Sequence, residues 1–146
     1  MPDFPVFIGC TEQEQVKDLF FDMEWSISKS SGIIQLTKLL PLDVVYSGFH
    51  SEAIGGVWKR HREQFSNFIL ECATGRSIVE MGGSNGTLAE VCFEKDNNIN
   101  SWKIVEPNPD PNYQQTNQKI KIIESFIEDA VTIFDDSPVF VHSHVL

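Results

Sequence analysis

The sequence predicts an α/β fold, in which a mostly parallel sheet carries helices on both of its faces. From residue 77 onwards, short apolar segments typical of buried strands alternate with amphipathic segments typical of helices. A glycine-rich turn joins the first strand to the first helix, and acidic residues close two of the strands. The 146 residues, with 41% hydrophobic content, are enough for one ordinary domain.

The N-terminal part of the chain is the least regular in its pattern. Residues 11–21 predict a short helix, because the first of them have capping-box spacing and apolar residues follow on one face. Residues 22–50 mix apolar residues with serine, glycine and proline, which favours short strands and loops. We therefore expect a small α/β or helical region over 1–50, followed by the sheet domain over 51–146.

Residues 51–74 predict one long amphipathic helix, since apolar side chains recur at spacings of three and four. Gly75 suits the position just after its last turn, where φ is positive. Three aromatic or imidazole side chains lie around the start of this helix: Tyr46, His50 and Trp58. They form either a lid over a bound cofactor or an aromatic patch of the core.

The rest of the chain alternates between the two kinds of element. We expect strands over 77–81, 102–106, 119–123 and 139–142, and helices over 87–94 and 127–134. The connection over 107–118 is long enough to hold a further short helix. Apolar strands separated by helices favour a Rossmann-like sheet. Such sheets usually have five or more strands, so we expect this chain to be a C-terminally truncated part of a longer protein.

The most informative segment runs from Glu80 to Gly86 and reads Glu-Met-Gly-Gly-Ser-Asn-Gly. Its glycines let the backbone approach a ligand closely, and the following helix presents free N–H groups at its first turn. Glu106 ends the next strand, near the spacing of roughly twenty residues at which dinucleotide-binding folds hold a ribose hydroxyl. These features predict a nucleotide-cofactor pocket with the following residues: Glu80, Gly82, Gly83, Ser84, Asn85, Gly86 and Glu106.

Further candidates follow the second and third strands. Pro107 stops the second strand and leaves the Glu106 carboxylate at the edge of the sheet, where it can accept ribose hydroxyls. Asn108 either lines the same ribose or stabilises the turn. Ser125 and Phe126 follow the third strand, where they either contact an adenine ring or, for Phe126, belong to the core.

The fourth strand ends in His142, Ser143 and His144, at the edge where open α/β sheets bind ligands. Either histidine is a candidate catalytic residue that orients a substrate or acts as a base, because imidazole titrates near neutral pH. Ser143 is a candidate cofactor contact. The alternative is that one histidine is simply hydrogen-bonded and partly buried.

The glycine turn has two other interpretations besides a cofactor pocket. Gly82–Gly86 also spells the Gly-x-Ser-x-Gly elbow of α/β-hydrolases, in which Ser84 would be the nucleophile. Such a serine needs a later acid and histidine, and only His142 and His144 follow it. A nicotinamide-binding loop requires glycine where Met81 stands, so that fingerprint fails by one residue.

Charge and cysteine content argue against several classes of function. The net charge of −10 disfavours binding to nucleic-acid phosphates, and the one basic cluster, Lys59–Arg62, is expected to be a solvated helix face. The cysteines Cys10, Cys72 and Cys92 stand far apart, so we expect neither a disulfide framework nor a metal site. No segment has membrane-spanning length and no signal peptide is visible, which makes the cytoplasm the expected location.

Several segments between Tyr46 and Leu146 together carry a family resemblance. They are His50-Ser51, Gly55–Trp58, Phe65–Ile69, Val79–Gly86, Val105–Asn108 and Val141–Leu146. With them the chain resembles class I S-adenosylmethionine-dependent methyltransferases, above all the group acting on nucleotide sugars or bacterial surface-polysaccharide components. In that family an acidic-x-Gly-x-Gly-x-Gly turn wraps the methionine part of the cofactor. Ser84 replaces the middle glycine, which the turn tolerates if that residue does not need positive φ.

The resemblance implies S-adenosylmethionine as cofactor and direct displacement of its methyl group by a hydroxyl or a carbon acid of the substrate. The substrate would be a small molecule such as a nucleotide sugar, with no nucleic acid or membrane as partner. Related proteins often carry an N-terminal zinc module. Only Cys10 lies in that region here, so the module is degenerate or absent and we expect no metal.

Substrate groups in this family come mainly from the C-terminal half of the domain, so the chain alone need not be catalytic. An exposed sheet edge would allow two copies of the chain to form a homodimer. The alternative to an enzyme is a noncatalytic α/β interaction module that keeps the fold. Such a module is expected to have its glycine turn occluded, for example by a side chain that fills the adenosine pocket.

Overall fold

The structure is a computed structural model in which the chain divides into two compact units, residues 1–48 and 49–146. Sequence patterns place the boundary at about the same point, after residue 50. The residues described are 1–6, 14, 17–47, 55–114, 116–130, 134 and 138–143.

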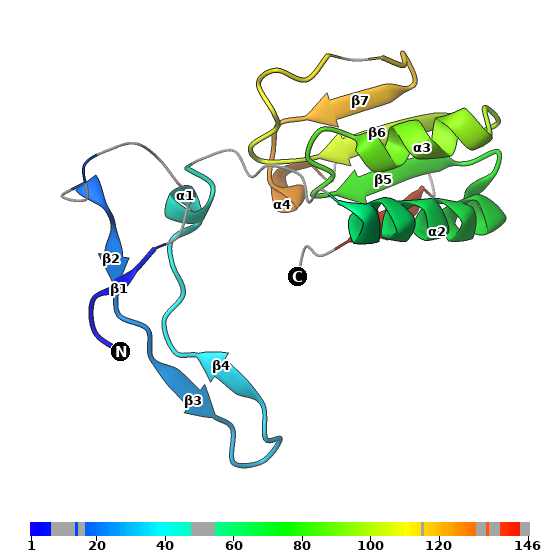
Figure 1. The fold of residues 1–146 in the computed structure, drawn as a ribbon. Helices are drawn as coiled ribbons and strands as arrows, with labels where there is room; N and C mark the ends of the chain where they lie inside the picture. Colours follow the sequence, from blue (N-terminus) through cyan, green and yellow to red (C-terminus); the bar gives the residue numbers. More distant parts are fainter. Residues whose placement is uncertain are drawn as a thin grey trace. The chain divides into compact units, whose positions relative to one another are not determined.

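The first unit consists of short antiparallel strand pairs and one short helix (Figure 1). Its elements are β1 (Phe4–Pro5), β2 (Phe20–Phe21), β3 (Trp25–Ile27), β4 (Ile34–Leu36) and α1 (Leu42–Val45). β1 pairs with β2, and β3 pairs with β4. The strands expected within 22–50 are therefore present, together with a helical turn that the pattern did not predict.

The helix predicted over 11–21 is wrong at its C-terminal end. Phe20 and Phe21 form β2, in antiparallel register with Pro5 and Phe4. Aromatic side chains favour extended backbone, and pairing with a distant strand outweighs the local helical pattern. Residues 11–13 and 15–16 of the predicted helix lie outside the described residues.

The second unit contains a four-stranded, all-parallel sheet in the order β7-β6-β5-β8. Its strands are β5 (Ser77–Met81), β6 (Ser101–Val105), β7 (Ile120–Ile123) and β8 (Val139–His142). Met81 is paired with Val105 and His142, and Val105 is paired with Ile123. The carboxyl ends of all four strands therefore lie at one edge of the sheet. The predicted strand positions are confirmed to within one residue at each end.

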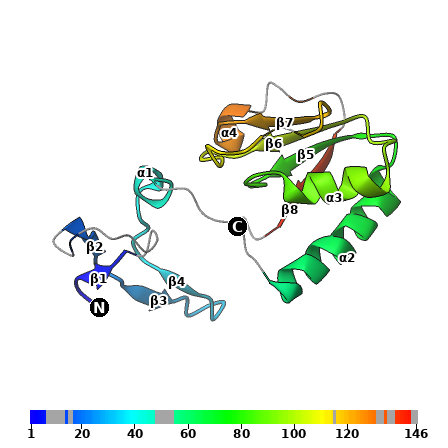
Figure 2. The same cartoon turned by 45° about the horizontal axis from the view of Figure 1, so that its top comes forward.

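Helices cover both faces of this sheet, as Figures 1 and 2 show. α2 (Gly56–Ala73) and α3 (Thr87–Lys95) pack on one face, over the larger core. α4 (Ile127–Ala130) packs on the other face, against Val79 and Val105. Gly75 has φ of +76°, as predicted for the residue that follows α2.

The connection after β6 differs from the prediction. Its described residues, 107–114 and 116–118, form turns and irregular backbone with no helix. Prolines at positions 107, 109 and 111 remove N–H donors and disfavour helical backbone in the residues before them. The helix predicted over 127–134 is confirmed as far as Ala130, and residues 131–133 lie outside the described part. At its predicted end the helix is wrong, because Phe134 is not helical.

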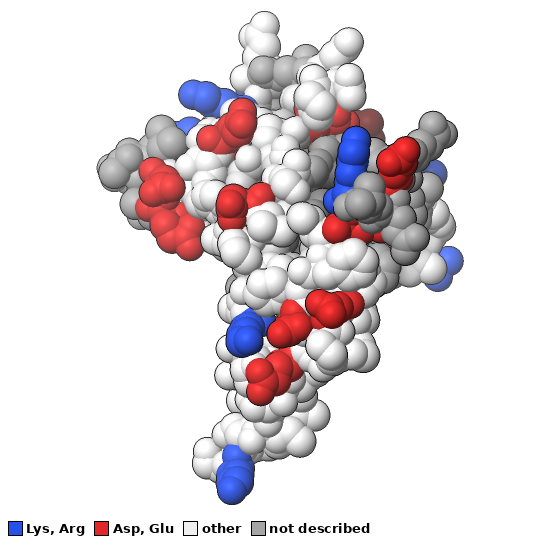
Figure 3. Space-filling view, turned by 90° about the vertical axis from the view of Figure 1, so that its left-hand side faces the viewer, with Lys and Arg blue, Asp and Glu red and all other residues white. Residues whose placement is uncertain are grey.

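Acidic side chains are spread over the face of the molecule shown in Figure 3, with fewer basic side chains between them. This distribution agrees with the net charge of −10. Within the described part of the chain, no helix combines the length and the apolar character needed to cross a membrane.

Candidate functional site

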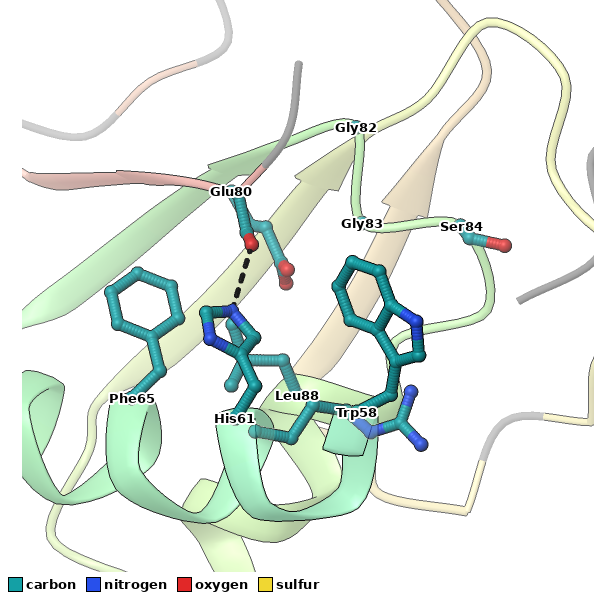
Figure 4. A pocket seen from close by; sticks show the side chains of 10 residues that line it. Trp58, His61, Phe65, Glu80, Gly82, Gly83, Ser84 and Leu88 are labelled. Carbon is teal, nitrogen blue, oxygen red and sulfur yellow. Dashed lines mark hydrogen bonds between the residues drawn. The ribbon is translucent and has the colours of Figure 1, made fainter. Parts of the chain in front are cut away.

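A cavity of about 190 Å³ lies beside the carboxyl ends of β5 and β8. From β5 the chain extends the sheet to one side through β6 and β7, and it then adds β8 on the other side of β5. Open α/β sheets bind ligands where the strand order reverses in this way. The cavity is lined by Trp58, His61, Arg62, Phe65, Glu80, Gly82, Gly83, Ser84, Leu88 and Ser143 (Figure 4).

The turn between β5 and α3 has three residues with positive φ. Gly82 has φ of +68°, Ser84 of +48° and Gly86 of +79°. Serine was expected to be tolerated in place of the middle glycine if that position did not need positive φ. Ser84 does have positive φ, so this condition is not met. This conformation costs a non-glycine residue about 1–2 kcal/mol. Non-glycine residues in such strained conformations concentrate at ligand sites.

The glycines of the turn are needed first for packing within the protein. A Cβ on Gly83 would lie 2.7 Å from Cδ of Glu80 and 2.8 Å from Cγ2 of Ile104. A Cβ on Gly86 would lie 2.9 Å from Cδ1 of Ile104. At these two positions the backbone approaches side chains of β5 and β6 closely, so glycine is needed there for packing within the protein.

Glu106 joins the glycine turn to the end of β6. Its Oε2 accepts a hydrogen bond from the Ser84 N–H at 3.1 Å, and its Oε1 accepts one from the Asn108 N–H at 3.1 Å. The side chain is 9% exposed. A carboxylate has about four lone-pair positions, so the two bonds leave further acceptor capacity. The predicted ribose-binding acid thus also holds the turn in place.

Glu80 lies under the turn and is 4% exposed. Its Oε2 accepts a hydrogen bond of 2.8 Å from Nε1 of Trp102. Burial, together with the nearby Glu80 carboxylate, raises the pKa of Cys92 to about 12. The Cys92 thiol therefore stays protonated near neutral pH and is no nucleophile.

The α2 side of the cavity is built by Trp58, His61 and Phe65, which face Glu80 and the turn in Figure 4. The His61 ring stacks on Phe65 with 5.7 Å between ring centroids, and it meets Trp58 edge-on at 5.8 Å. Nε2 of His61 and Oγ of Ser143 share a hydrogen bond of 3.2 Å, which links α2 to the end of β8.

The expectation that Lys59–Arg62 forms only a solvated helix face is therefore wrong for two of its residues. His61 and Arg62 line the cavity. The signal for His61 was present in the sequence, since it lies three residues after Trp58 and four before Phe65, on one face of the helix.

Asn85, Ser125 and Pro107 have local structural roles in the described part of the chain. Oδ1 of Asn85 accepts hydrogen bonds from the N–H and the hydroxyl of Thr87, at 3.3 and 2.8 Å, at the start of α3. The Ser125 N–H donates to the backbone oxygen of Glu106 at 3.3 Å, and its hydroxyl donates to that of Phe126 at 2.9 Å. Pro107 lies in the bend after β6 and is half-buried, like Phe126.

Of the two histidines predicted at the end of β8, His142 is not brought into the cavity. His142 is exposed and is not among the lining residues, whereas its neighbour Ser143 is. His144 lies outside the described residues, as does His50 of the predicted lid. Of that lid, Trp58 lines the cavity, and Tyr46 belongs to the first unit.

The hydrolase interpretation needs a histidine that hydrogen-bonds the Ser84 hydroxyl. Oγ of Ser84 is buried and has no hydrogen-bond partner within the described residues. His61 instead bonds Ser143, and His142 is exposed. The geometry therefore does not favour a nucleophilic Ser84.

Comparison of the sequence with protein-family models gives no match, and comparison with curated proteins gives none either. The described residues also form no group of three or more His, Cys, Asp or Glu side chains that could hold a metal ion.

Proposed function

We propose that the chain is a Rossmann-like, S-adenosylmethionine-binding methyltransferase domain. The observation that carries this proposal is the link between the glycine turn and Glu106, beside a cavity at the point where the strand order reverses. A buried carboxylate at the end of β6, bonded only to backbone N–H groups in the described structure, suits a ligand that brings hydroxyl donors.

The residues present fit the two ends of this cofactor. Glu106 has acceptor capacity for the ribose hydroxyls. The cavity of about 190 Å³ is smaller than the roughly 300–1,000 Å³ typical of whole-ligand pockets, so it suits the amino-acid end. Arg62 and Glu80 give that cavity groups of both charge signs, matching a zwitterionic amino acid.

The bound cofactor would supply a methyl group activated on a sulfonium. The chain would contribute positioning: the turn and Glu106 hold one end, while α2 and Ser143 enclose the other. The acceptor is expected to be a sugar or a related small metabolite, as the resemblance implies. His142 is kept as a candidate base at the sheet edge, and His61 joins it because its ring lies in the cavity.

The second candidate is a noncatalytic interaction module, and one observation favours it. The Tyr113 hydroxyl lies 3.8 Å from the position of a Cβ on Gly86, so this side chain packs against the turn. Such an arrangement is expected where a side chain occupies a nucleoside site. The two candidates differ in a measurable way, because only the methyltransferase needs to bind the cofactor.

The test is isothermal titration calorimetry of the 146-residue chain with S-adenosylhomocysteine. We expect saturable binding at one site, weakened at least tenfold by Glu106→Ala, since the ribose hydroxyls would lose a charged acceptor. Glu124→Ala is the matched control, because Glu124 is exposed and follows β7 at the same edge. Absence of binding by a folded wild-type chain would overturn the proposal and leave the interaction module.

A further inference from the structure

The first unit has no fully buried residue among positions 1–6, 14 and 17–47, the part of it that the structure describes. The buried residues belong instead to the second unit. Exposed large apolar side chains gather in the first unit: Met1, Leu19, Phe20, Trp25, Ile27, Ile33, Ile34, Leu39 and Leu42. Exposed apolar side chains that lie together mark interaction surfaces. This exposure indicates that the first unit packs against a partner.

The β3–β4 hairpin carries part of this apolar surface on one of its faces (Figure 1). The two strands pair so that Trp25 lies opposite Leu36 and Ile27 lies opposite Ile34. Because side chains alternate along a strand, these four residues share one face, called the hairpin face below. Trp25, Ile27 and Ile34 are 57%, 65% and 61% exposed. A two-stranded hairpin is marginally stable alone in water, so an apolar face of this kind is stabilised by cover.

The two ends of the hairpin differ in charge. Between residues 25 and 36 the one charged side chain is Lys29, which lies in the turn at the tip. At the base, Asp22 and Glu24 precede β3 and Lys38 follows β4, so two carboxylates and one ammonium group leave the base negative. When two copies pack their hairpin faces together in opposite directions, each positive tip lies at the negative base of the other copy. Packing in the same direction would bring like charges together instead.

A second copy of the chain matches the hairpin face better than the second unit does. Among the described residues of the second unit, the exposed large apolar side chains are Val57 and Phe68 on α2 and Phe140 on β8. The hairpin face of another copy offers four apolar side chains in one plane, and a two-fold dimer pairs the same patch of both subunits. The hairpin face has no charged side chain, so its burial desolvates no charge.

We propose that the hairpin face is an interface at which two copies of the chain form a weak, two-fold symmetric dimer, with the Lys29 tip of each copy at the Glu24 base of the other. The exposed parts of the face come to roughly 300 Å² on each copy, by the areas that such side chains bury. An interface of this size belongs with small, transient ones. This inference goes beyond the proposed function and does not depend on it, since no ligand takes part.

The test is sedimentation-velocity ultracentrifugation of the full chain without ligand, from about 1 µM to about 500 µM. We expect a reversible monomer–dimer equilibrium with a Kd of about 10–100 µM. Ile34→Thr keeps a β-branched residue but places a hydroxyl in the hairpin face, and it should raise the Kd about tenfold or more. Gln35→Thr is the matched control, because Gln35 pairs with Ser26 on the opposite face, and its Kd should equal that of the wild type.

A charge swap tests the direction of packing. Lys29→Glu places like charges together at both ends of the interface, so it should weaken the dimer about threefold, as expected for charges at an exposed rim. The double variant Lys29→Glu with Glu24→Lys reverses both ends and should restore the Kd of the wild type. Such a rescue is not expected of nonspecific association through apolar surface.

Three results would overturn the inference. A chain that stays monomeric up to about 500 µM would show that the second unit or another protein covers the hairpin face. Equal Kd values for Ile34→Thr and Gln35→Thr would show that the dimer uses another surface. Failure of the double charge variant to restore the Kd would contradict packing in opposite directions. If Ile34→Thr did not fold, as judged by far-UV circular dichroism, the charge variants would decide alone, since Lys29 and Glu24 are both exposed.

Discussion

The hydrogen bonds of Glu106 lead to a prediction about the stability of the second unit. Glu106→Gln keeps the length of the side chain but removes its charge and one of its two acceptor oxygens. In the wild type each oxygen accepts one backbone N–H at 3.1 Å, from Ser84 and from Asn108. In the variant one of these N–H groups must face the amide NH₂ group, which is itself a donor.

The expected loss of stability can be worked out from the two hydrogen bonds that Glu106 accepts. A hydrogen bond to a charged group contributes about 1.5–3 kcal/mol, and a neutral one about 1 kcal/mol. Loss of one bond and weakening of the other should lower the free energy of unfolding by about 2–3 kcal/mol. For a unit of about one hundred residues, this corresponds to a fall in Tm of roughly 10 °C or more.

Differential scanning calorimetry without added ligand measures this change directly. Glu124→Gln is the control, because Glu124 is exposed and should cost at most about 0.5 kcal/mol. A fall in Tm for Glu106→Gln no larger than that of Glu124→Gln would refute the argument that Glu106 holds the turn.

Three further predictions concern packing and ionisation. Gly83→Ala should lower the free energy of unfolding in urea by about 1–3 kcal/mol, because the added Cβ would lie 2.7 Å from Cδ of Glu80. The control Gly56→Ala has open space around the added Cβ and should not lower it. Trp102→Phe should cost about 2–4 kcal/mol by the same assay, since it leaves a void and removes the donor to Glu80; a loss below 1 kcal/mol would contradict this. The Cys92 thiol ionises near pH 9 in the unfolded chain but near pH 12 in the fold, so its contribution to stability is lost as pH rises through that window. The stability difference between wild type and Cys92→Ala should therefore shrink by up to about 1.4 kcal/mol per pH unit above pH 9, and a constant difference would contradict the burial of this thiol.

The sheet was predictable because its signals are local. Each strand is a short, mostly apolar segment, and Gly75 marks the end of α2 through a backbone requirement that glycine meets best. β2 was missed because Phe20 and Phe21 are placed by pairing with Phe4 and Pro5, a contact that no local pattern reveals. Local periodicity therefore predicts a helix or strand best where pairing with distant segments does not change the structure that the local sequence already favours.

The candidate site was predictable only in part for a related reason. The turn and Glu106 are visible as residues at strand ends, but the bond from Ser84 to Glu106 depends on the register of β5 against β6. His61 enters the site through the way α2 packs on the sheet, which helical periodicity alone does not determine. The close approach of Gly83 to Ile104 likewise follows from tertiary packing.

The central claim is that an S-adenosyl ligand binds at the glycine turn. A titration of the ¹⁵N-labelled chain with S-adenosylhomocysteine, followed by two-dimensional NMR, tests it most directly. If the ligand binds there, we expect saturable shifts of the amide signals of Gly82, Gly83 and Gly86 and of the Trp58 indole N–H. The amide of Gly75, which precedes β5 at the opposite edge of the sheet, should not move. Unchanged turn signals at millimolar ligand, or shifts confined to other parts of the chain, would contradict the claim.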